Sequence, residues 1–267
     1  MLQYRDLKNA LNELGIKRSD PTFVHASASL IPLVKGGAQT LLGAILAGID
    51  NILMPSFTFK TMIIPEVGPE DNLIEYGSGR NENLNASVFT PDLPADFEDQ
   101  AISELFRHYP DVIRSNHPIF SFLGLGLDAA LASQTTAEPY GHIQYLQGKN
   151  TKILLADKEP SALFSLHFCE KESGRKQFLR WAMTEEGVKE CPFFPSCSDG
   201  FLKILFHLGN EVKQAQIQEH TWYALSLDSL IQTALQLLHE DPYALLCNDL
   251  HCKKCNAIRK DIRQRRW

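Results

Sequence analysis

Three short apolar segments that alternate with helical stretches constrain the fold of this chain more than any other feature. Residues 22–25 and 51–55 each have the apolar run expected of a buried strand, and a helix that begins near Ala38 separates them. A third strand is expected over residues 152–157. Strand, helix and strand in this order predict a parallel βαβ unit.

The same strands predict where a ligand binds. In open α/β sheets, ligands bind outside the carboxyl ends of the strands. The loops that follow Val24, Met54 and Ala156 are therefore expected to converge on one site.

The remaining segments add helices, a strand-rich region and one long loop. Apolar periodicity predicts helices over residues 2–14, 101–109, 161–170 and 225–238, the first of them stopped by Gly15. Residues 119–125 are apolar, and residues 175–206 are rich in strand and turn residues. Residues 57–97 lack a regular pattern, and a loop of that length in a compact domain is functional or mobile.

Composition excludes several classes of function. The chain has 267 residues and a formal net charge of −6, which argues against a general nucleic-acid binder. Its apolar runs are too short for a membrane span, and its first residues lack the apolar core of a signal peptide, so a cytoplasmic protein is expected. The basic tail at 259–267 is either an RNA contact or, as we favour, a solvated helical end.

The segment from Phe23 to Thr40 has the residue order that a phosphate site needs. A strand leads into small hydroxyl residues, a lysine and a Gly-Gly pair, and then a helix begins. Helix N-terminal N–H groups favour an anion, Gly36 and Gly37 allow close approach, and Lys35 adds a charge. An ordinary strand-to-helix turn has the same pattern, and neither the P-loop nor the dinucleotide spacing is present.

Two histidines are candidates for catalysis. His167 lies on a predicted helix that follows a strand end, and Glu170 is on the same helix face three residues later. A histidine there can act as a general base, and the alternative is a core histidine with satisfied hydrogen bonds. His117, before Pro118, is either a second candidate or a turn residue whose ring bonds the backbone.

The six cysteines are clustered in a way that suggests metal binding. Cys252 and Cys255 form the C-x2-C pair of a structural zinc site, and Cys247 supplies a third ligand. A tetrahedral zinc site needs a fourth ligand, and the candidates for it are Cys197, Cys191 and His251. Reduced thiols that pack a helix junction are the competing interpretation.

Five sequence blocks, taken in order, resemble the aminoglycoside 3-N-acetyltransferase family. They are V-H-A-S at 24–27 with G-G-A at 36–38, L-M-P-S-F-T at 53–58, R-S-N-H-P-I-F-S at 114–121, P-Y-G at 139–141 and S-L-H-F-C-E at 165–170. One block is weak evidence, but five in sequence over most of the chain are strong. The region around Cys197 and the terminal cysteine group also resembles a branch of this family.

The resemblance implies a fold and an activity. The fold is α/β, with a central mixed, largely parallel sheet flanked by helices. Residues 1–267 form a single domain, which ends in a small cysteine-containing element at about 240–267. The activity is transfer of an acetyl group from acetyl-CoA to an amine of an aminoglycoside-like substrate. Small-molecule amine and acyl-CoA are the partners, with no nucleic acid and no membrane.

The resemblance also assigns roles to residues. His167 takes a proton from the attacking amine within a ternary complex, and Glu170 orients its imidazole. Structural zinc is held by Cys197, Cys247, Cys252 and Cys255. Acetyl-CoA is bound by Ser27, Ser29, Lys35, Gly36, Gly37, Ala38, Ser115 and His117, with the phosphates at the Gly-Gly helix start.

Three departures from the family pattern bear on the acceptor. Phe59 and Lys60 stand where some members have an aspartate, and Ala26 replaces the first serine of its block. Residues 195–198, where an acidic residue is expected, contain no carboxylate, so Glu190 or Asp199 is expected to substitute. Cationic acceptors need carboxylates, and the acidic loop with Glu66, Glu70, Asp71 and Glu75 is expected to compensate.

Two alternatives therefore stay open. One is an acyltransferase that modifies another amine with a different acyl-CoA. The other is a zinc-stabilised protein that keeps the CoA groove but has lost catalysis.

Overall fold

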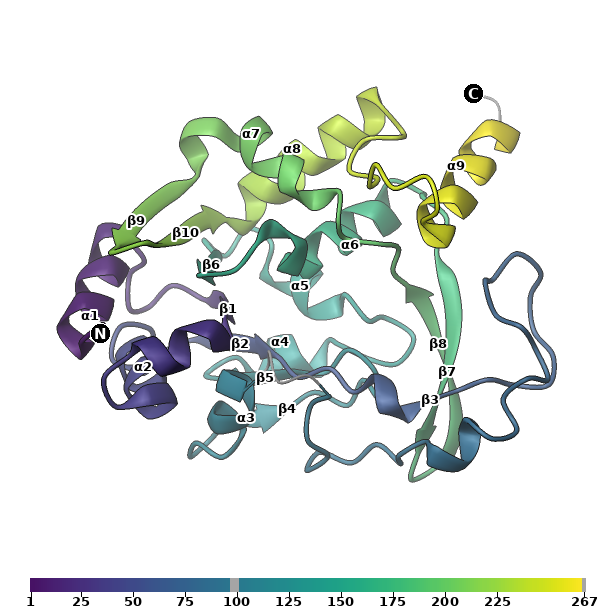
Figure 1. Cartoon of the computed structure of the whole chain (residues 1–267), viewed down its shortest axis with the longest axis horizontal. Helices are drawn as coiled ribbons and strands as arrows, with labels where there is room; N and C mark the ends of the chain where they lie inside the picture. Colours follow the sequence, from purple (N-terminus) through teal and green to yellow (C-terminus); the bar gives the residue numbers. More distant parts are fainter. Residues whose placement is uncertain (97–100, 266–267) are drawn as a thin grey trace.

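A seven-stranded sheet forms the centre of the molecule in a computed structural model that describes residues 1–96 and 101–265 (Figure 1). The strands lie in the order β4-β5-β2-β1-β6-β10-β9. Their bounds are β1 Thr22–Ala26, β2 Ile52–Pro55, β4 Ile113–Arg114, β5 Phe122–Leu125, β6 Lys152–Ala156, β9 Lys213–Ile217 and β10 His220–Ser226. β1 pairs in parallel with β2 and β6, and the other pairings are antiparallel. Because β4 and β9 then point the same way as these three, only β5 and β10 run in the opposite direction, and the expected mixed, largely parallel sheet is confirmed.

The central strands are apolar on both faces because helices cover both sides of the sheet. Successive side chains of a strand point to opposite faces. Phe23 and Leu155 accordingly belong to one core, and Val24 and Leu154 belong to the other. The near-continuous apolar runs of β1 and β6 follow from this burial on both faces.

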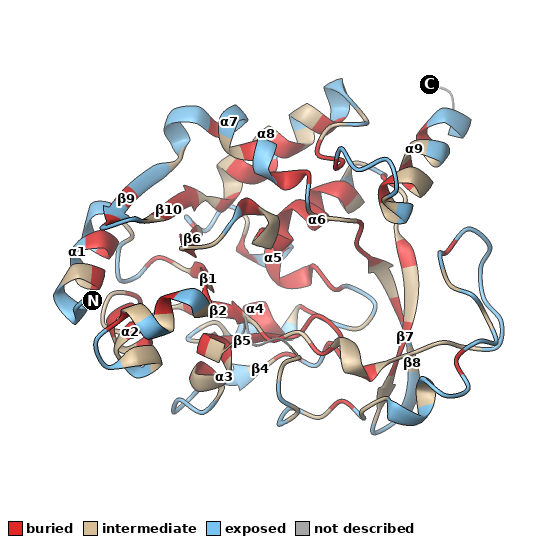
Figure 2. Cartoon of the chain, in the orientation of Figure 1, coloured by how far each residue is buried: buried red, intermediate tan, exposed pale blue. Residues whose placement is uncertain are grey.

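Within the described ranges, three helices cover one face of the sheet and four cover the other. The first set is α1 Tyr4–Glu13, α2 Gly37–Leu46 and α3 Ala101–Arg107, and the second is α4 Asp128–Ala132, α5 Gly141–Leu146, α6 Phe164–Glu172 and α8 Leu227–Glu240. Figure 2 shows α6 buried along most of its length, because it lies between the sheet and α8. In the described part of the chain, no helix is both long and apolar enough to cross a bilayer.

A second, three-stranded sheet and a C-terminal helix complete the structure. The sheet has the order β3-β7-β8, with β3 Met62–Ile63, β7 Phe178–Thr184 and β8 Gly187–Phe194. α7 (Ile204–Leu208) precedes the β9-β10 hairpin, and α9 (Lys253–Arg265) ends the described chain. Leu246, Cys247, Cys255, Ile258 and Ile262 form a small separate core beneath α9. The expected cysteine-containing element is present. Of the basic tail, residues 266–267 lie outside the described residues.

Several boundaries differ from the sequence expectations. The helix expected from residue 225 begins at Leu227, because Leu225 and Ser226 pair with β6 as the last residues of β10. The β9-β10 hairpin was not expected, since the alternating K-Q-A-Q-I of β9 is short and polar on one face. Only Phe122–Leu125 of the apolar run at 119–125 is strand.

Short 3₁₀ helices replace two expected segments. Ala28–Leu33, expected as loop, forms the 3₁₀ helix η1, and Pro160–Ala162 forms η5 before α6 begins at Phe164. The long loop contains two more, η2 Phe59–Thr61 and η3 Asn83–Asn85, and strand β3. Residue 97, the end of that loop, lies outside the described residues.

Candidate active site

A cleft of about 620 Å³ opens at the carboxyl ends of β1, β2 and β6. Ser27, Phe57 and Asp157, which follow these three strands, all line it. The expected convergence of the three loops is therefore confirmed. A volume of this size is typical of small-molecule sites.

His167 reaches this cleft from the second turn of α6. Pro160 and the η5 turn end the loop after β6, so that the helix begins close to the strand end. His167 lines the cleft and is 7% exposed. Its Nδ1 lies 2.7 Å from Oε2 of Glu170, one helical turn later. Because the carboxylate takes up Nδ1, Nε2 is the ring nitrogen available to a molecule in the cleft.

Glu170 is the carboxylate partner of this histidine. It is fully buried, and its Oε1 accepts a hydrogen bond from Nη1 of Arg175 at 2.7 Å. Burial by itself raises the pKa of the carboxyl, but the hydrogen bond and charge of His167 and the guanidinium of Arg175 outweigh it. The pKa of Glu170 therefore lies below its usual value, and the group is a carboxylate at neutral pH.

The expectation that Glu190 or Asp199 substitutes for the missing acidic residue is wrong for this cleft. Glu190 and Asp199 are both exposed, and neither contributes to the cleft wall. In the segment where the family pattern has a carboxylate, Ser196 donates its hydroxyl to Glu170, with Oγ 2.9 Å from both carboxylate oxygens. A second buried carboxylate here would repel Glu170, so a neutral donor is the compatible residue.

A chain of hydrogen bonds runs along the other side of the cleft. Oγ of Ser27 accepts from the backbone N–H of Ser29 and lies 2.6 Å from its hydroxyl. The Ser29 hydroxyl donates to Oδ2 of Asp157 at 3.0 Å, and Oδ1 of Asp157 lies 3.1 Å from Nδ1 of His220. Asp157 has a φ of 56°, a conformation that costs energy in a residue other than glycine. The structure thus brings Ser27 to the cleft wall and Ser29 directly behind it.

The predicted phosphate residues lie at the start of α2, outside the wall of the cleft. Gly36, the N-cap residue, has a φ of 90°, and Gly37 has a φ of 63°. The N–H of Gly37 donates to the carbonyl oxygen of Val34, but glycine has no side chain to cap the helix, so the N–H groups of Ala38 and Gln39 have no side-chain cap. Lys35 is exposed, and Ala38 is half-buried. The six residues of η1 separate this helix start from Ser27 by roughly 12 Å along the 3₁₀ axis.

Ser115 and His117 are not brought to the cleft. Oγ of Ser115 donates to Gln134 and accepts from the N–H of Phe122. His117 is completely buried, and its Nδ1 accepts the backbone N–H groups of Ile119 and Phe120. Burial lowers the pKa of His117 to about 3. His117 is therefore the turn residue of the alternative interpretation, with its ring bonded to the backbone. Nothing in this arrangement supports a direct contact of Ser115 or His117 with the cofactor.

The cleft is more aromatic than the sequence suggested, and the carboxylates on its wall are Asp157 and Glu159 rather than those of the long loop. Five phenylalanines line it, namely Phe57, Phe59, Phe120, Phe164 and Phe194. Lys60 does not line it, and its Nζ lies 3.1 Å from Oδ1 of Asp96. None of the four acidic residues of the 66–75 loop is among the described residues that line the cleft, and Asp71 pairs with Lys260 instead. The expectation that this loop compensates for the missing carboxylates is wrong for this cleft.

The four cysteines predicted as metal ligands do come together. The Sγ atoms of Cys197, Cys247, Cys252 and Cys255 all lie within 4.8 Å of one another. Cys247 and Cys255 are buried, and the other two are half-buried. The alternatives Cys191 and His251 are not in this group. Four thiols at this spacing are a ligand set suited to tetrahedral zinc.

Sequence reasoning missed three residues that shape the site. Arg175 holds Glu170 from behind, Ser196 bonds it from the loop before Cys197, and Lys254 lines the cleft from the first turn of α9. Lys254 lies between Cys252 and Cys255 in C-K-K-C, and its place in this motif is the sequence signal that could have pointed to it. The contacts of the other two are not encoded in any local spacing.

Comparisons with known proteins agree with this geometry. A family model described as aminoglycoside 3-N-acetyltransferase matches residues 23–239. The aminoglycoside N(3)-acetyltransferase IX of Micromonospora chalcea is 29% identical over 174 residues, which is 61% of this chain and 60% of that protein. The SPbeta prophage-derived aminoglycoside N(3')-acetyltransferase-like protein YokD of Bacillus subtilis (strain 168) is 31% identical over 172 residues, 58% of this chain and 61% of the relative. The matches thus span about three fifths of the length of these relatives.

Solved structures share the fold. The crystal structure of YokD has a TM-score of 0.77 at 20% identity and covers 90% of this chain and 94% of its own. The structure described as AAC-IIIb binary with CoASH has a TM-score of 0.69 at 18% identity, with coverage of 89% and 96%. At these identities the likeness is one of fold.

Proposed function

The chain belongs to the aminoglycoside 3-N-acetyltransferase family, and on that premise we propose that it transfers an acetyl group from acetyl-CoA to an amine of an aminoglycoside-like acceptor. The observation that carries the proposal is the His167–Glu170 pair on the wall of a cleft at the carboxyl ends of three parallel strands. An ionised, fully buried carboxylate fixed to Nδ1 is the arrangement that a histidine base needs.

The chain's own groups account for the proton movements of this reaction. The Glu170 carboxylate keeps the proton on Nδ1, so Nε2 is free to accept a proton from the attacking amine. As the new C–N bond forms, the C–S bond of the thioester breaks, and the proton taken by His167 passes to the departing thiolate. Glu170 stabilises the imidazolium that exists between these two transfers.

The residues around η1 fit the other end of acetyl-CoA. The open N-terminus of α2 and the exposed Lys35 suit its phosphates, while Ser27 and Ser29 lie between that end and His167. A relative whose structure is described as binary with CoASH has the same fold, which supports this placement. Acetyl-CoA supplies the activated acyl group.

The test is His167→Ala, with Glu170→Gln as a variant that keeps shape and removes charge. Thiol release from acetyl-CoA is measured with a panel of aminoglycosides, and acetyl-CoA binding is followed by thermal shift. His167→Ala should lose about a hundred-fold or more in kcat while still being stabilised by acetyl-CoA. Replacement of the exposed His239, which is not among the residues that line the cleft, is the matched control. Undiminished transfer by His167→Ala refutes the proposal.

One observation favours a different amine as a second candidate acceptor. Five phenylalanines line the cleft, and its charged residues are two carboxylates and two lysines, so the wall suits an acceptor with an apolar body and few charges. In the same assay, an aromatic or aliphatic amine panel separates the two candidates by the ratio of their kcat/KM values. A catalytically silent homologue is the less favoured candidate, because His167 keeps a buried carboxylate partner, Glu170, beside the cleft.

We also propose that the four clustered cysteines bind structural zinc. Their Sγ separations of at most 4.8 Å support this assignment. The purified protein should contain about one zinc per chain, and a chelator should lower its Tm, because metal binding is coupled to folding. Cys252→Ser should lose the metal, whereas Cys191→Ala, a buried cysteine outside the cluster, should retain it. Zinc-free protein with an unchanged Tm in chelator would favour free thiols.

A further inference from the structure

Arg175 lies directly behind the catalytic pair, in the turn between α6 and β7. It is only 7% exposed, although it carries a charge. Its Nη1 donates to Oε1 of Glu170, and its Nη2 donates to the carbonyl oxygens of Pro242 and Ala244, with all three donor–acceptor distances 2.7 Å. A planar guanidinium that spans a carboxylate and two carbonyls has little freedom to rotate.

Glu170 is thereby held by three donors at once. Arg175 occupies Oε1, His167 lies at Oε2, and the Ser196 hydroxyl is 2.9 Å from both oxygens. One of these donors, Ser196, lies in a segment that carries the cysteine cluster, and another, Arg175, is hydrogen-bonded to such a segment. Ser196 directly precedes Cys197, and the carbonyls that bind Arg175 lie just before Cys247.

We propose that Arg175 is a positioning residue for acyl transfer: it fixes the Glu170 carboxylate in the orientation that His167 needs and ties it to the 242–247 segment that leads into the cysteine cluster. The proposal rests on the proposed function, because it concerns the same His167–Glu170 pair. Arg175 itself does not line the cleft and acts only through Glu170.

The physical argument follows from burial. Without the guanidinium, Glu170 loses the permanent positive charge beside it and one of its three donors, so burial favours protonation of the carboxyl. A protonated Glu170 no longer stabilises the imidazolium of His167. Lysine at this position restores the charge but cannot span Glu170 and both carbonyls.

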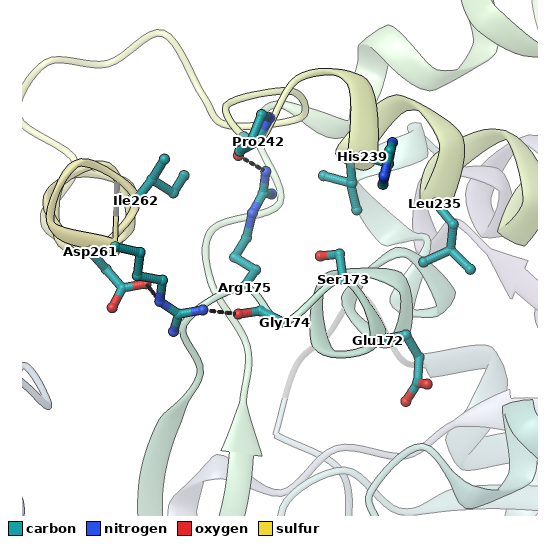
Figure 3. A pocket seen from close by; sticks show the side chains of 11 residues that line it. Glu172, Ser173, Gly174, Arg175, Leu235, His239, Pro242, Asp261 and Ile262 are labelled. Atoms are coloured by element: carbon teal, nitrogen blue, oxygen red, sulfur yellow. Dashed lines mark hydrogen bonds and ion pairs between the residues drawn. The ribbon is translucent and has the colours of Figure 1, made fainter. Parts of the chain in front are cut away.

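A cavity on the far side of Arg175 makes the proposal directly testable. It has a volume of about 720 Å³ and is lined by the end of α6, the end of α8 and α9. Figure 3 shows Arg175 on its wall, bonded to Pro242, with Gly174 and Ser173 beside it. Truncation of Arg175 would open this cavity toward Glu170, so that a free guanidinium ion can enter and take the place of the side chain.

The experiment compares Arg175→Ala and Arg175→Lys with the wild type. Arg265→Ala is the matched control, because Arg265 donates to the carbonyl of Gly174 and pairs with Asp261 but does not contact Glu170. Arg175→Ala should lose about ten-fold or more in kcat, with the KM for acetyl-CoA nearly unchanged. The acidic limb of its kcat/KM profile should move to higher pH. Millimolar guanidinium should restore part of kcat, whereas sodium chloride at equal ionic strength should not.

The kcat of Arg175→Lys should lie between that of Arg175→Ala and that of the wild type. Arg265→Ala should retain the wild-type kcat. Unchanged kcat and pH profile in Arg175→Ala overturn the proposal. The proposal is also overturned if Arg175→Ala loses activity, guanidinium restores none of it and the pH profile does not move. Such a loss would be a purely structural effect.

A spectroscopic readout separates this proposal from the proposed function. The Nδ1 proton of His167, hydrogen-bonded to a carboxylate, gives a downfield NMR signal that needs no turnover. This signal should move upfield in Arg175→Ala and stay in place in Arg265→Ala. If the wild type transfers no acyl group to any acceptor, the proposed function fails. The NMR comparison still decides the role of Arg175, because an unmoved signal in Arg175→Ala overturns it.

Discussion

Substitution of the buried His142 by leucine should make the protein more resistant to acid. His142 is completely buried on α5, with its ring centroid 4.4 Å from that of Phe122 and 5.7 Å from that of Phe23. Among the described residues, neither ring nitrogen has a hydrogen-bond partner. Burial, with a smaller contribution from His117, lowers the pKa of His142 to about 3.

The sign and size of the effect follow from this pKa. In the unfolded chain the ring has a pKa of about 6.5, so below that pH the unfolded state binds a proton that the folded state refuses. The stability contribution is therefore present above pH 6.5 and is lost as pH falls. At pH 5 a folded-state pKa of about 3 corresponds to a loss of about 2 kcal/mol from His142 alone.

Urea denaturation at pH 7, 6 and 5 measures this loss. His142→Leu should remove about 2 kcal/mol of the wild-type decrease in unfolding free energy between pH 7 and pH 5. It should also be no less stable than the wild type at pH 7, because two unpaired polar atoms leave the core. Ile143→Val is the control, since it destabilises the same helix without changing a titrating group. The reasoning is refuted if His142→Leu keeps the wild-type dependence on pH.

Three further substitutions test other parts of the structure. Gly141→Ala would place a Cβ 1.8 Å from a backbone carbonyl oxygen, and urea denaturation should show a loss of about 3 kcal/mol or more; a smaller loss would mean that the neighbouring turn gives way. Gly200→Ala would place a Cβ 2.2 Å from the carbonyl oxygen of Leu245, so the two halves of the cysteine cluster should separate and metal analysis should show less bound zinc, with unchanged content arguing against this packing. Ser196→Asp sets a second carboxylate against Glu170, and a kcat at neutral pH equal to that of the wild type would contradict the expected repulsion.

The fold was largely predictable because its signals are local. The alternation of apolar strands with helices in the first third of the chain predicted the parallel centre of the sheet, and β1, β2 and β6 formed within two residues of the expected bounds. The elements that were missed, such as β9 and the edge strand β4, are short and depend on pairing partners for their stability.

In the candidate site, too, the contacts between near neighbours were predictable and those between distant residues were not. The pairing of His167 with Glu170 could be predicted, because a spacing of three residues places both side chains on one helix face. The role of His117 could not, since exposure depends on what packs over a residue. Ser196 lies 26 residues from Glu170 in the sequence, and no periodicity links the two.

The sequence alone determined that this chain has an α/β fold, with His167 and Glu170 beside the strand ends of its sheet. It also determined that four cysteines are candidate ligands of one metal ion. Helical and strand geometry fix such relations between near neighbours. Only the tertiary structure decided that Cys197 joins the terminal cysteines and that Arg175 and Ser196 hold Glu170. These contacts join residues that are distant along the chain, and their strength comes from the exclusion of water, which exists only once the core has closed around them.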